Sequence, residues 1–336
     1  MSFRVEIGTR SAGGGSQAVF LLSDATGANR AEVWPSLSCN CLRWSVAGSA
    51  GPLELLYVAP DWQSNPIPTR SGNPVLFPFP NRIRDGRFTW DGKEYQLPIN
   101  GPNGRHAIHG FACRKKWRVL ESSSSPAKAW VTAQFQGSID APETLAYWPA
   151  DYRITLTIEL EPNRLTFVAR MDNPDAKPLP FGLGYHPYFA VPFAAGGECS
   201  VSSPARAMWK LVENVPTGQI VPPPPDHDLR TPRRIADLHL DDVYTDFGPQ
   251  TGLYRQGRIE QPEVGAMEIW TSPGFRELVG FTPPHRKAMC LEPYTCTTDA
   301  ANLQARGIDA GWRVLMPGDA VTEDVEYRFR RVGDSP

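Results

Sequence analysis

The chain has 336 residues, of which 21% are charged and 41% are hydrophobic, a mixture typical of a folded globular protein and unlike a disordered or collagen-like chain. Its 34 Lys and Arg residues nearly balance its 36 Asp and Glu residues, so the formal net charge is −2. Because a composition so close to neutral gives no electrostatic reason to bind polyanions, we expect no nucleic-acid partner and no membrane partner.

Strand patterns recur along the chain from its N-terminus. Residues 3–10 alternate between apolar and polar side chains, and residues 18–35 predict two strands joined by a turn. Further on, the Asp91-Gly92 pair lies between aromatic and β-branched residues, which is a strong signal for a hairpin. In residues 152–174 the alternation is nearly strict, as is typical of antiparallel strands with one buried face.

Helices are expected to be scarce, because 34 prolines are scattered along the chain and each lacks a backbone donor. Short helical turns are predicted within residues 231–242 and 297–307. The Ser122–Ser125 and Pro222–Pro225 runs are predicted to be surface loops. Since no internal repeat or change of composition marks a linker, we predict one all-β domain over residues 1–336, a large antiparallel β-sandwich.

The six cysteines include no Cys-x-x-Cys pair, which argues against a zinc ribbon or a thioredoxin-type motif, and we expect free buried thiols. Because the N-terminal residues alternate in polarity and lack a basic start followed by an apolar run, we expect no signal peptide. No uncharged apolar stretch approaches the roughly 20 residues needed to span a bilayer. We therefore expect a cytoplasmic protein.

Three segments concentrate polar, aromatic and turn-forming residues in the manner of a functional site. Each candidate side chain also has an ordinary structural explanation, such as a turn, a core histidine or an ion pair. The spacing alone does not bring the three segments together in space. They are residues 73–117 with Asn81, Arg82 and His109, residues 182–189 with His186, and residues 289–302 with Glu292.

The order of five sequence elements resembles that of the aldose 1-epimerase (galactose mutarotase) family. The elements are FPFPNRIRDGRF, IHGF, YHPYF, LDDVYTDF and CLEPYTCTTDAAN, which follow one another in this order between residues 77 and 302. The resemblance extends over nearly the whole chain. The resemblance implies the large antiparallel β-sandwich of that family, a galactose mutarotase-like supersandwich, which agrees with the strand pattern. It also implies an isomerase that interconverts the α and β anomers of a hexose.

The resemblance further implies an acid–base pair. His186 stands where the family has its general acid, Glu292 where it has its general base, and His109 matches a second histidine near the ring oxygen of the sugar. Opening the hemiacetal requires a proton to leave the C1 hydroxyl while another reaches the ring oxygen, and two side chains of this kind can supply both transfers. On this reasoning Glu292 needs a raised pKa and His186 needs to be held as imidazolium.

The sugar hydroxyls would be held by three further residues that the resemblance identifies. Asn81 and Arg82 match the Asn-Arg pair of the family, and Asp241 matches its carboxylate, although a one-residue slip would place Asp242 there instead. The reaction needs no cofactor and no metal, so the only partner that we expect is a small sugar. The chain is expected to be a monomer or a homodimer.

Several alternatives remain open at this level. The stretches PVLFPFP and IHGFACR also resemble those of hexose-6-phosphate mutarotases. In those enzymes, cations such as Arg105, Arg114 and Lys115 would contact the phosphate, although these side chains also suit a solvated rim. A non-catalytic carbohydrate-binding β-sandwich would use Arg82 and Asp241 without ring opening. A metal site built on the His106-x-x-His109 pair is a weaker hypothesis, since no third ligand stands out.

Overall fold

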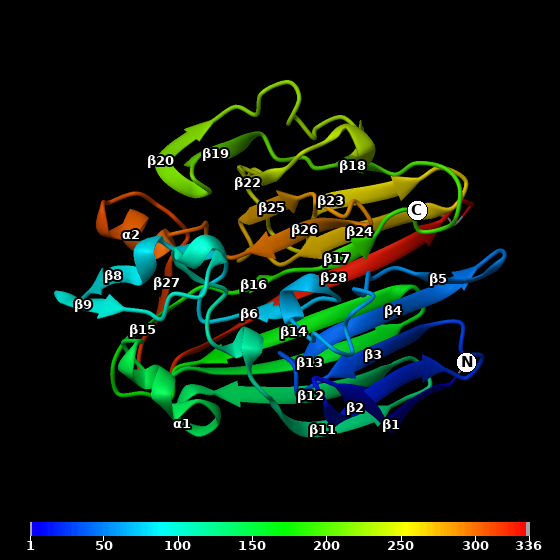
Figure 1. The fold of residues 1–336 in the computed structure, drawn as a ribbon, viewed down its shortest axis with the longest axis horizontal. Coiled ribbons are helices and arrows are strands. Elements are labelled where there is room, and N and C mark those ends of the chain that lie inside the picture. Colours follow the sequence, from blue (N-terminus) through cyan, green and yellow to red (C-terminus); the bar gives the residue numbers. More distant parts are fainter. Residues whose placement is uncertain (1, 334–336) are drawn as a thin grey trace.

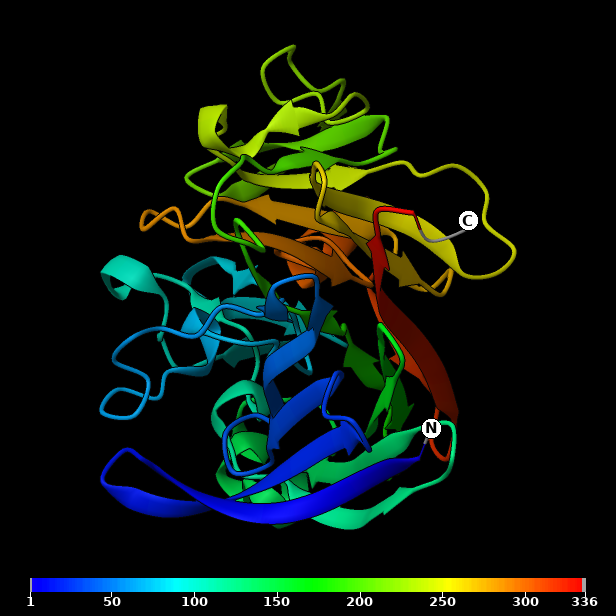
Figure 2. The ribbon, with the colours of Figure 1, turned by 90° about the vertical axis from the view of Figure 1, so that its right-hand side faces the viewer.

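The computed structural model describes residues 2–333, and these are folded almost entirely into antiparallel strands (Figures 1 and 2). The N-terminal part is a five-stranded meander in which each strand pairs with the next one along the chain. Its strands are β1 (Phe3–Ala12), β2 (Gly15–Asp24), β3 (Arg30–Trp34), β4 (Asn40–Gly48) and β5 (Gly51–Glu54).

The largest sheet has nine strands. Strand β28 lies in its middle, and Figure 2 shows this strand in red, passing along one side of the molecule between the green and the yellow strands. In spatial order the strands are β11 (Arg118–Ser124), β12 (Ala129–Gln136), β13 (Arg153–Glu161), β14 (Arg164–Asp172), β28 (Ala320–Arg331), β24 (Gly265–Thr271), β23 (Tyr254–Gln261), β18 (Ser200–Ser202) and β21 (Arg233–Arg234).

The third large sheet has eight strands and, as shown below, carries the candidate site. Its spatial order is β20 (Val215–Val221), β19 (Ala207–Val212), β22 (Asp241–Thr245), β25 (Glu277–Phe281), β26 (Ala288–Tyr294), β16 (Gly184–Tyr185) and β6 (Val75–Leu76), with β17 (Tyr188–Ala190) also paired to β26.

Short ribbons and helical turns complete the described part of the chain. The ribbons pair β7 (Arg82–Ile83) with β10 (Ala107–Ile108), β8 (Arg87–Trp90) with β9 (Lys93–Gln96), and β15 (Leu179–Phe181) with β27 (Arg313–Leu315). The α-helices are α1 (Gly137–Asp140) and α2 (Ala300–Ala305), and 3₁₀ turns occur at Pro68–Arg70, Arg84–Gly86, Pro102–Gly104, Ala112–Arg114, Pro142–Ala146 and Ile235–Asp237. No helix within residues 2–333 is long and apolar enough to cross a membrane.

Side chains from all three large sheets meet in one hydrophobic core, which is why these sheets pack as a sandwich. Strand β13 shows the principle: Ile154, Leu156, Ile158 and Leu160 are fully buried, while the residues between them are partly exposed. Aromatic residues from distant parts of the chain join this core, among them Trp44 of β4. The structure thus confirms the predicted all-β antiparallel sandwich.

Most local predictions agree with the structure, and one is wrong. The hairpin at Asp91-Gly92 joins β8 to β9, with positive φ at both turn residues, and the six cysteines are free and buried. The run Ser122–Ser125 was expected to be a loop, but its first three residues belong to β11. Because β11 is an edge strand with a register shift, its polar side chains stay in contact with solvent, and composition therefore did not reveal the strand.

Candidate active site

All six residues predicted for the site line one cavity of about 310 Å³ on a face of the eight-stranded sheet. The segments that supply them lie far apart in the sequence: β26, β22, the turn between β16 and β17, and the β7–β10 ribbon. The six are Asn81, Arg82, His109, His186, Asp241 and Glu292. Folding therefore brings together the three segments that spacing alone left separate.

The pairing register places His186 directly across from Glu292. In the antiparallel pairs formed with β26, Gly184 lies opposite Tyr294 and Tyr188 lies opposite Cys290, so the residue midway between them faces Glu292. Pro187 follows His186 and lacks a backbone donor, which accounts for the break between β16 and β17 at this point. Residues in this relation have neighbouring side chains on the same face of the sheet.

The two side chains approach closely and are held by neighbouring tyrosines. The Nε2 atom of His186 lies 3.4 Å from Oε1 of Glu292. The hydroxyl of Tyr294 donates a hydrogen bond to Oε2 of the same carboxyl group. The ring of Tyr188 stacks on the imidazole of His186, with the ring centroids 4.7 Å apart and the planes 3° from parallel. The orientation of both members of the pair is thus fixed.

Burial decides which protonation state this pair prefers. It lowers the pKa of His186 from 6.5 to about 3, and the nearby Arg82 guanidinium acts in the same direction. Burial also raises the pKa of Glu292 well above 4.5; Asp241 adds to this effect, while Tyr294 and Arg82 oppose it. Burial thus favours the uncharged form of each group, a neutral imidazole and a protonated carboxyl, against the expectation that His186 is held as imidazolium.

The β7–β10 ribbon and the residues beside it also line the cavity. The backbone N–H of His109 donates to the carbonyl of Asn81 over 2.8 Å, and Nη1 of Arg82 donates to the side-chain oxygen of Asn81, also over 2.8 Å. Both Asn81 and His109 have positive φ. Gly110 follows with a φ of +66°, and a Cβ atom there would lie 2.3 Å from the Phe77 carbonyl oxygen, so the turn requires glycine.

Because side chains alternate along β22, Asp241 and Asp242 lie on opposite faces of this strand. Asp241 lines the cavity and accepts a hydrogen bond from Nδ2 of Asn214 over 2.9 Å. Asp242 lies 2.7 Å from Nδ1 of His227, which belongs to the loop that follows the proline run. Burial raises the pKa of Asp241, and Arg82 opposes that shift. The geometry thus favours Asp241 as the residue that faces a bound sugar.

Several residues of the site were not identified from the sequence. Cys290 and Tyr294 flank Glu292 at two-residue spacing on β26, and Tyr188 stands two residues after His186. Alternation in a strand puts such residues on the same face, so this spacing was the signal that could have revealed them. Unlike these three residues, Thr69, Asn100, Val279 and Phe281 line the cavity itself, and the sequence offers no comparable signal for them.

The cations considered for a phosphate group differ in their surroundings. Arg105 is paired with Glu213 at 2.8 Å, and Lys115 is paired with Glu143 at 2.5 Å. Arg114 lines the cavity and has no hydrogen bond or ion pair to any residue in the described range 2–333. His106 accepts a hydrogen bond from the backbone of Asp85 and does not line the cavity, so the His106-x-x-His109 pair does not form a metal site there.

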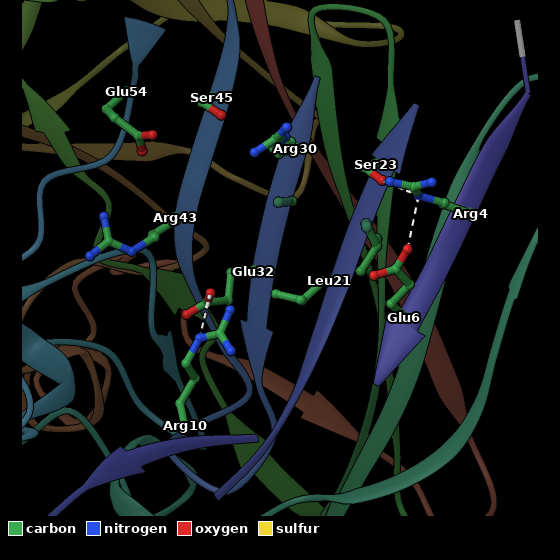
Figure 3. Close-up of a pocket in the computed structure, with 12 residues that line it drawn as sticks. Arg4, Glu6, Arg10, Leu21, Ser23, Arg30, Glu32, Arg43, Ser45 and Glu54 are labelled. Carbon is green, nitrogen blue, oxygen red and sulfur yellow. Dashed lines mark hydrogen bonds and ion pairs between the residues drawn. The ribbon is translucent and has the colours of Figure 1, made fainter. Parts of the chain in front are cut away.

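A second cavity, of about 330 Å³, lies over the five-stranded sheet (Figure 3). Much of its charge is already paired: Arg4 lies 3.0 Å from Glu6, and Arg10 lies 3.6 Å from Glu32. None of the described residues that line it is a histidine or a cysteine. It therefore lacks an acid–base pair of the kind formed by His186 and Glu292.

Comparisons with known proteins identify the family of the chain. A sequence model of the aldose 1-epimerase family matches residues 40–328. The uncharacterised protein YphB of Escherichia coli K12 is 28% identical over 262 residues, which is 75% of this chain and 82% of that protein. Galactose mutarotase of Sus scrofa is 27% identical over 219 residues, which is 60% of this chain and 59% of that protein.

Solved structures share the fold over nearly the full length. A galactose mutarotase-like protein from Clostridium acetobutylicum superposes with a TM-score of 0.83 at 23% identity, covering 97% of this chain and 99% of the other. Galactose 1-epimerase from Lactobacillus acidophilus superposes with a TM-score of 0.76 at 15% identity, covering 98% and 99%. At these identities the likeness establishes the supersandwich fold.

Proposed function

The chain belongs to the aldose 1-epimerase family, and we propose that it is itself a mutarotase that interconverts the α and β anomers of a hexose. The observation that carries this proposal is the His186–Glu292 pair, with 3.4 Å between Nε2 and Oε1 on the wall of a cavity of about 310 Å³. A sugar-binding protein without catalysis has no use for a close acid–base pair. A cavity of this size lies in the range of small-molecule sites.

Ring opening would use the pair in its charged form. The carboxylate of Glu292 takes the proton from the C1 hydroxyl while the imidazolium of His186 donates its proton to the ring oxygen. The C1–O5 bond breaks, the C1 carbonyl forms, and neither an alkoxide nor an oxocarbenium ion has to exist free. After this step Glu292 is protonated and His186 is neutral.

Ring closure would run the same transfers backwards. Rotation about the C1–C2 bond turns the other face of the aldehyde toward O5, His186 takes the O5 proton, and Glu292 returns its proton to O1. The pair carries one proton throughout, so no proton is exchanged with solvent during the cycle. Each positioned acid or base contributes about 10²–10⁴-fold to the rate.

The protonation state favoured by burial is the one that this scheme reaches after ring opening. In the proposed scheme a neutral His186 beside a protonated Glu292 is the state of the pair after ring opening, and burial shifts both pKa values toward this state. The buried site thereby stabilises the intermediate of the reaction, because two neutral groups lose less on leaving water than a carboxylate and an imidazolium do. The charged form is needed only when the cyclic sugar is in place.

The remaining residues would hold the sugar while C1 moves. Asp241 and Arg82 supply an acceptor and a cation on the cavity wall, and Asn81 orients Arg82 through their hydrogen bond. Burial lowers the pKa of His109 well below 6.5, so its imidazole is neutral and suited to hydrogen bonding near the ring oxygen. Fixing the sugar in this way converts the proton transfers into steps within one complex.

One observation favours a second candidate substrate for the same reaction, a hexose that carries a phosphate group. Arg114 lines the cavity without a partner among residues 2–333, and a phosphate on the sugar would supply one. Arg105 and Lys115 argue the other way, because both are already paired with glutamates. The neutral hexose remains the primary proposal.

Polarimetry tests both candidates directly. Freshly dissolved α-D-glucose, α-D-galactose and α-D-glucose 6-phosphate are followed with and without the protein, and the spontaneous rate is subtracted. We expect a protein-dependent rate with at least one neutral hexose. A rate only with the phosphate ester would establish the second candidate, and sugar binding with no added rate would establish a non-catalytic sugar-binding protein.

A further inference from the structure

A third buried group, the thiol of Cys290, lies beside the acid–base pair and has no part in the proposed reaction. The side chains of His186, Cys290 and Glu292 each offer a ligand atom, and these atoms all lie within 4.8 Å of one another. Within residues 2–333 no other group of three such side chains has this arrangement. All three residues are buried, with exposed fractions of 6%, 0% and 2%.

The pairing of strands in the eight-stranded sheet brings these three side chains together. Cys290 and Glu292 alternate on β26 and therefore share a face, and His186 lies across from Glu292 between two residues paired to that strand. On the other side, Phe281 of β25 lies opposite Cys290. Rigid strands therefore hold the three ligand atoms, which is the kind of support that a preorganised site needs.

The donor set matches the preferences of one class of ion. Thiolate, imidazole and carboxylate are the ligands of zinc and related transition metals, whereas calcium and magnesium prefer oxygen alone. The 3.4 Å between Nε2 and Oε1 already equals the roughly 3.4 Å between neighbouring ligands in a tetrahedral zinc site. The thiol would have to approach by only about 1 Å to complete three such contacts.

The charges also balance. A divalent cation with one thiolate, one carboxylate and one neutral imidazole sums to zero, which suits a buried site. Binding releases two protons, one from the Cys290 thiol and one from the His186–Glu292 pair. Asp241 lies close enough to act electrostatically on both Cys290 and Glu292, so its negative charge also attracts a cation, although Arg82 acts on Glu292 with the opposite sign.

We propose that His186, Cys290 and Glu292 bind a thiophilic divalent transition-metal ion such as Zn²⁺, and that the bound ion inhibits the enzyme. The ion occupies the lone pairs of His186 and Glu292 that the proton transfers require. The inhibition, though not the binding, rests on the function proposed above. The hydrogen bond from Tyr294 holds the far oxygen of Glu292 and orients the carboxyl group toward the ion.

Cobalt(II) provides a test that does not depend on activity. The purified protein, stripped with a chelator, is titrated with Co²⁺ while the thiolate-to-cobalt charge-transfer absorption in the near ultraviolet is recorded. Three proteins are compared: wild type, Cys290→Ser, and the matched control Cys199→Ser, whose buried thiol faces Gln261 on a different sheet. Circular dichroism confirms that each is folded.

We expect the absorption band in wild type and in Cys199→Ser, and its loss in Cys290→Ser. A further variant, Glu292→Gln, keeps the thiol and is expected to weaken Co²⁺ binding by more than about tenfold. Zn²⁺ should inhibit mutarotation by wild type and by Cys199→Ser, a chelator should reverse the inhibition, and Cys290→Ser should need at least about tenfold more Zn²⁺ for the same inhibition.

The absence of a band in wild type, or a band that persists in Cys290→Ser, would overturn the proposed metal site. If Cys290→Ser does not fold, the loss of affinity in Glu292→Gln decides the question on its own. A wild-type protein that shows the band but no mutarotation would instead leave the metal site standing and refute the proposed function. The two proposals therefore fail in different ways.

Discussion

Asp241 and Asp242 are consecutive on β22, yet their side chains have different neighbours. Asp241 lines the sugar-sized cavity, whereas Asp242 lies 2.7 Å from Nδ1 of His227. The two carboxylates have the same chemistry and nearly the same position in the chain. They therefore form a matched pair for testing which of them contacts a substrate.

Replacing each aspartate by alanine should separate their roles. We expect Asp241→Ala to raise KM and to lower kcat, with kcat/KM reduced about 10- to 100-fold, since a hydrogen bond to a charged group is worth roughly 1.5–3 kcal/mol. Asp242→Ala should keep KM near that of wild type and loosen the loop that contains His227. Steady-state kinetics by coupled assay or polarimetry measures both, and equal kinetic defects would remove Asp241 from the sugar.

Substitutions in the acid–base pair should lower kcat far more than substitutions of the sugar-binding residues. Glu292→Gln and His186→Asn each remove a proton donor or acceptor and are expected to lower kcat by about 10²–10⁴-fold. Glu277→Gln is the matched control, because Glu277 is equally buried on the adjacent strand β25 but does not line the cavity. Retention of more than a few per cent of turnover in either site variant at neutral pH would refute its assigned role.

How much of this could be predicted from the sequence depends on the range of each interaction. The strand β13 and the Asp91-Gly92 hairpin follow from local alternation and turn chemistry, and the structure confirms both. The six site residues followed from the family resemblance. The contacts among these residues could not be predicted from their spacing. The register that places His186 across from Glu292 joins strands from distant parts of the chain.

Protonation was the least predictable property. The sequence argument assigned an imidazolium to His186, whereas burial by strands from several segments favours the neutral ring. A pKa depends on how far surrounding chain excludes water, and no local pattern reports that quantity. The same limit explains why Cys290 was expected only as a buried thiol and not as a neighbour of the pair.

The pH dependence of kcat/KM should be bell-shaped, because the His186–Glu292 pair is active only when it carries one proton. Adding a second proton ends activity on the acidic side, and losing the only proton ends it on the alkaline side. Because burial lowers the pKa of His186 to about 3 and raises that of Glu292 well above 4.5, the acidic limb should lie well below pH 6.5 and the alkaline limb far above pH 4.5. The spontaneous rate is subtracted at every pH. An acidic limb at the usual imidazole pKa would contradict the lowered pKa of His186.

Tyr294→Phe should move the alkaline limb without removing the pair. The hydroxyl of Tyr294 donates to the Glu292 carboxyl and lowers its pKa, so losing that bond should raise the pKa of Glu292 further and shift the limb to higher pH. KM should change little, because Tyr294 does not line the cavity. The control is Tyr152→Phe, which removes another buried hydroxyl, bonded to Thr144. If both variants give the wild-type profile, Tyr294 has no influence on the pair.

Glu277 should make the stability of the fold depend on pH. Its side chain is fully buried; Trp209 donates to Oε2 over 3.0 Å, and Oε1 has no hydrogen bond within the described residues, with Nε of Arg276 at 3.9 Å. Burial raises the pKa of Glu277 to about 8. Between the unfolded value near 4.5 and this folded value, the folded protein keeps a proton that the unfolded chain has lost.

The free energy of unfolding should therefore fall as pH rises through that interval, by at most about 1.4 kcal/mol per pH unit from this group. Glu277→Gln cannot ionise and should lose this slope, so relative to wild type it gains stability from about pH 5 to about pH 8. Urea denaturation at both pH values measures the difference. Glu94→Gln, at an exposed position on β9, serves as the control and should follow wild type. If Glu277→Gln follows wild type as well, the buried carboxyl does not titrate in this range.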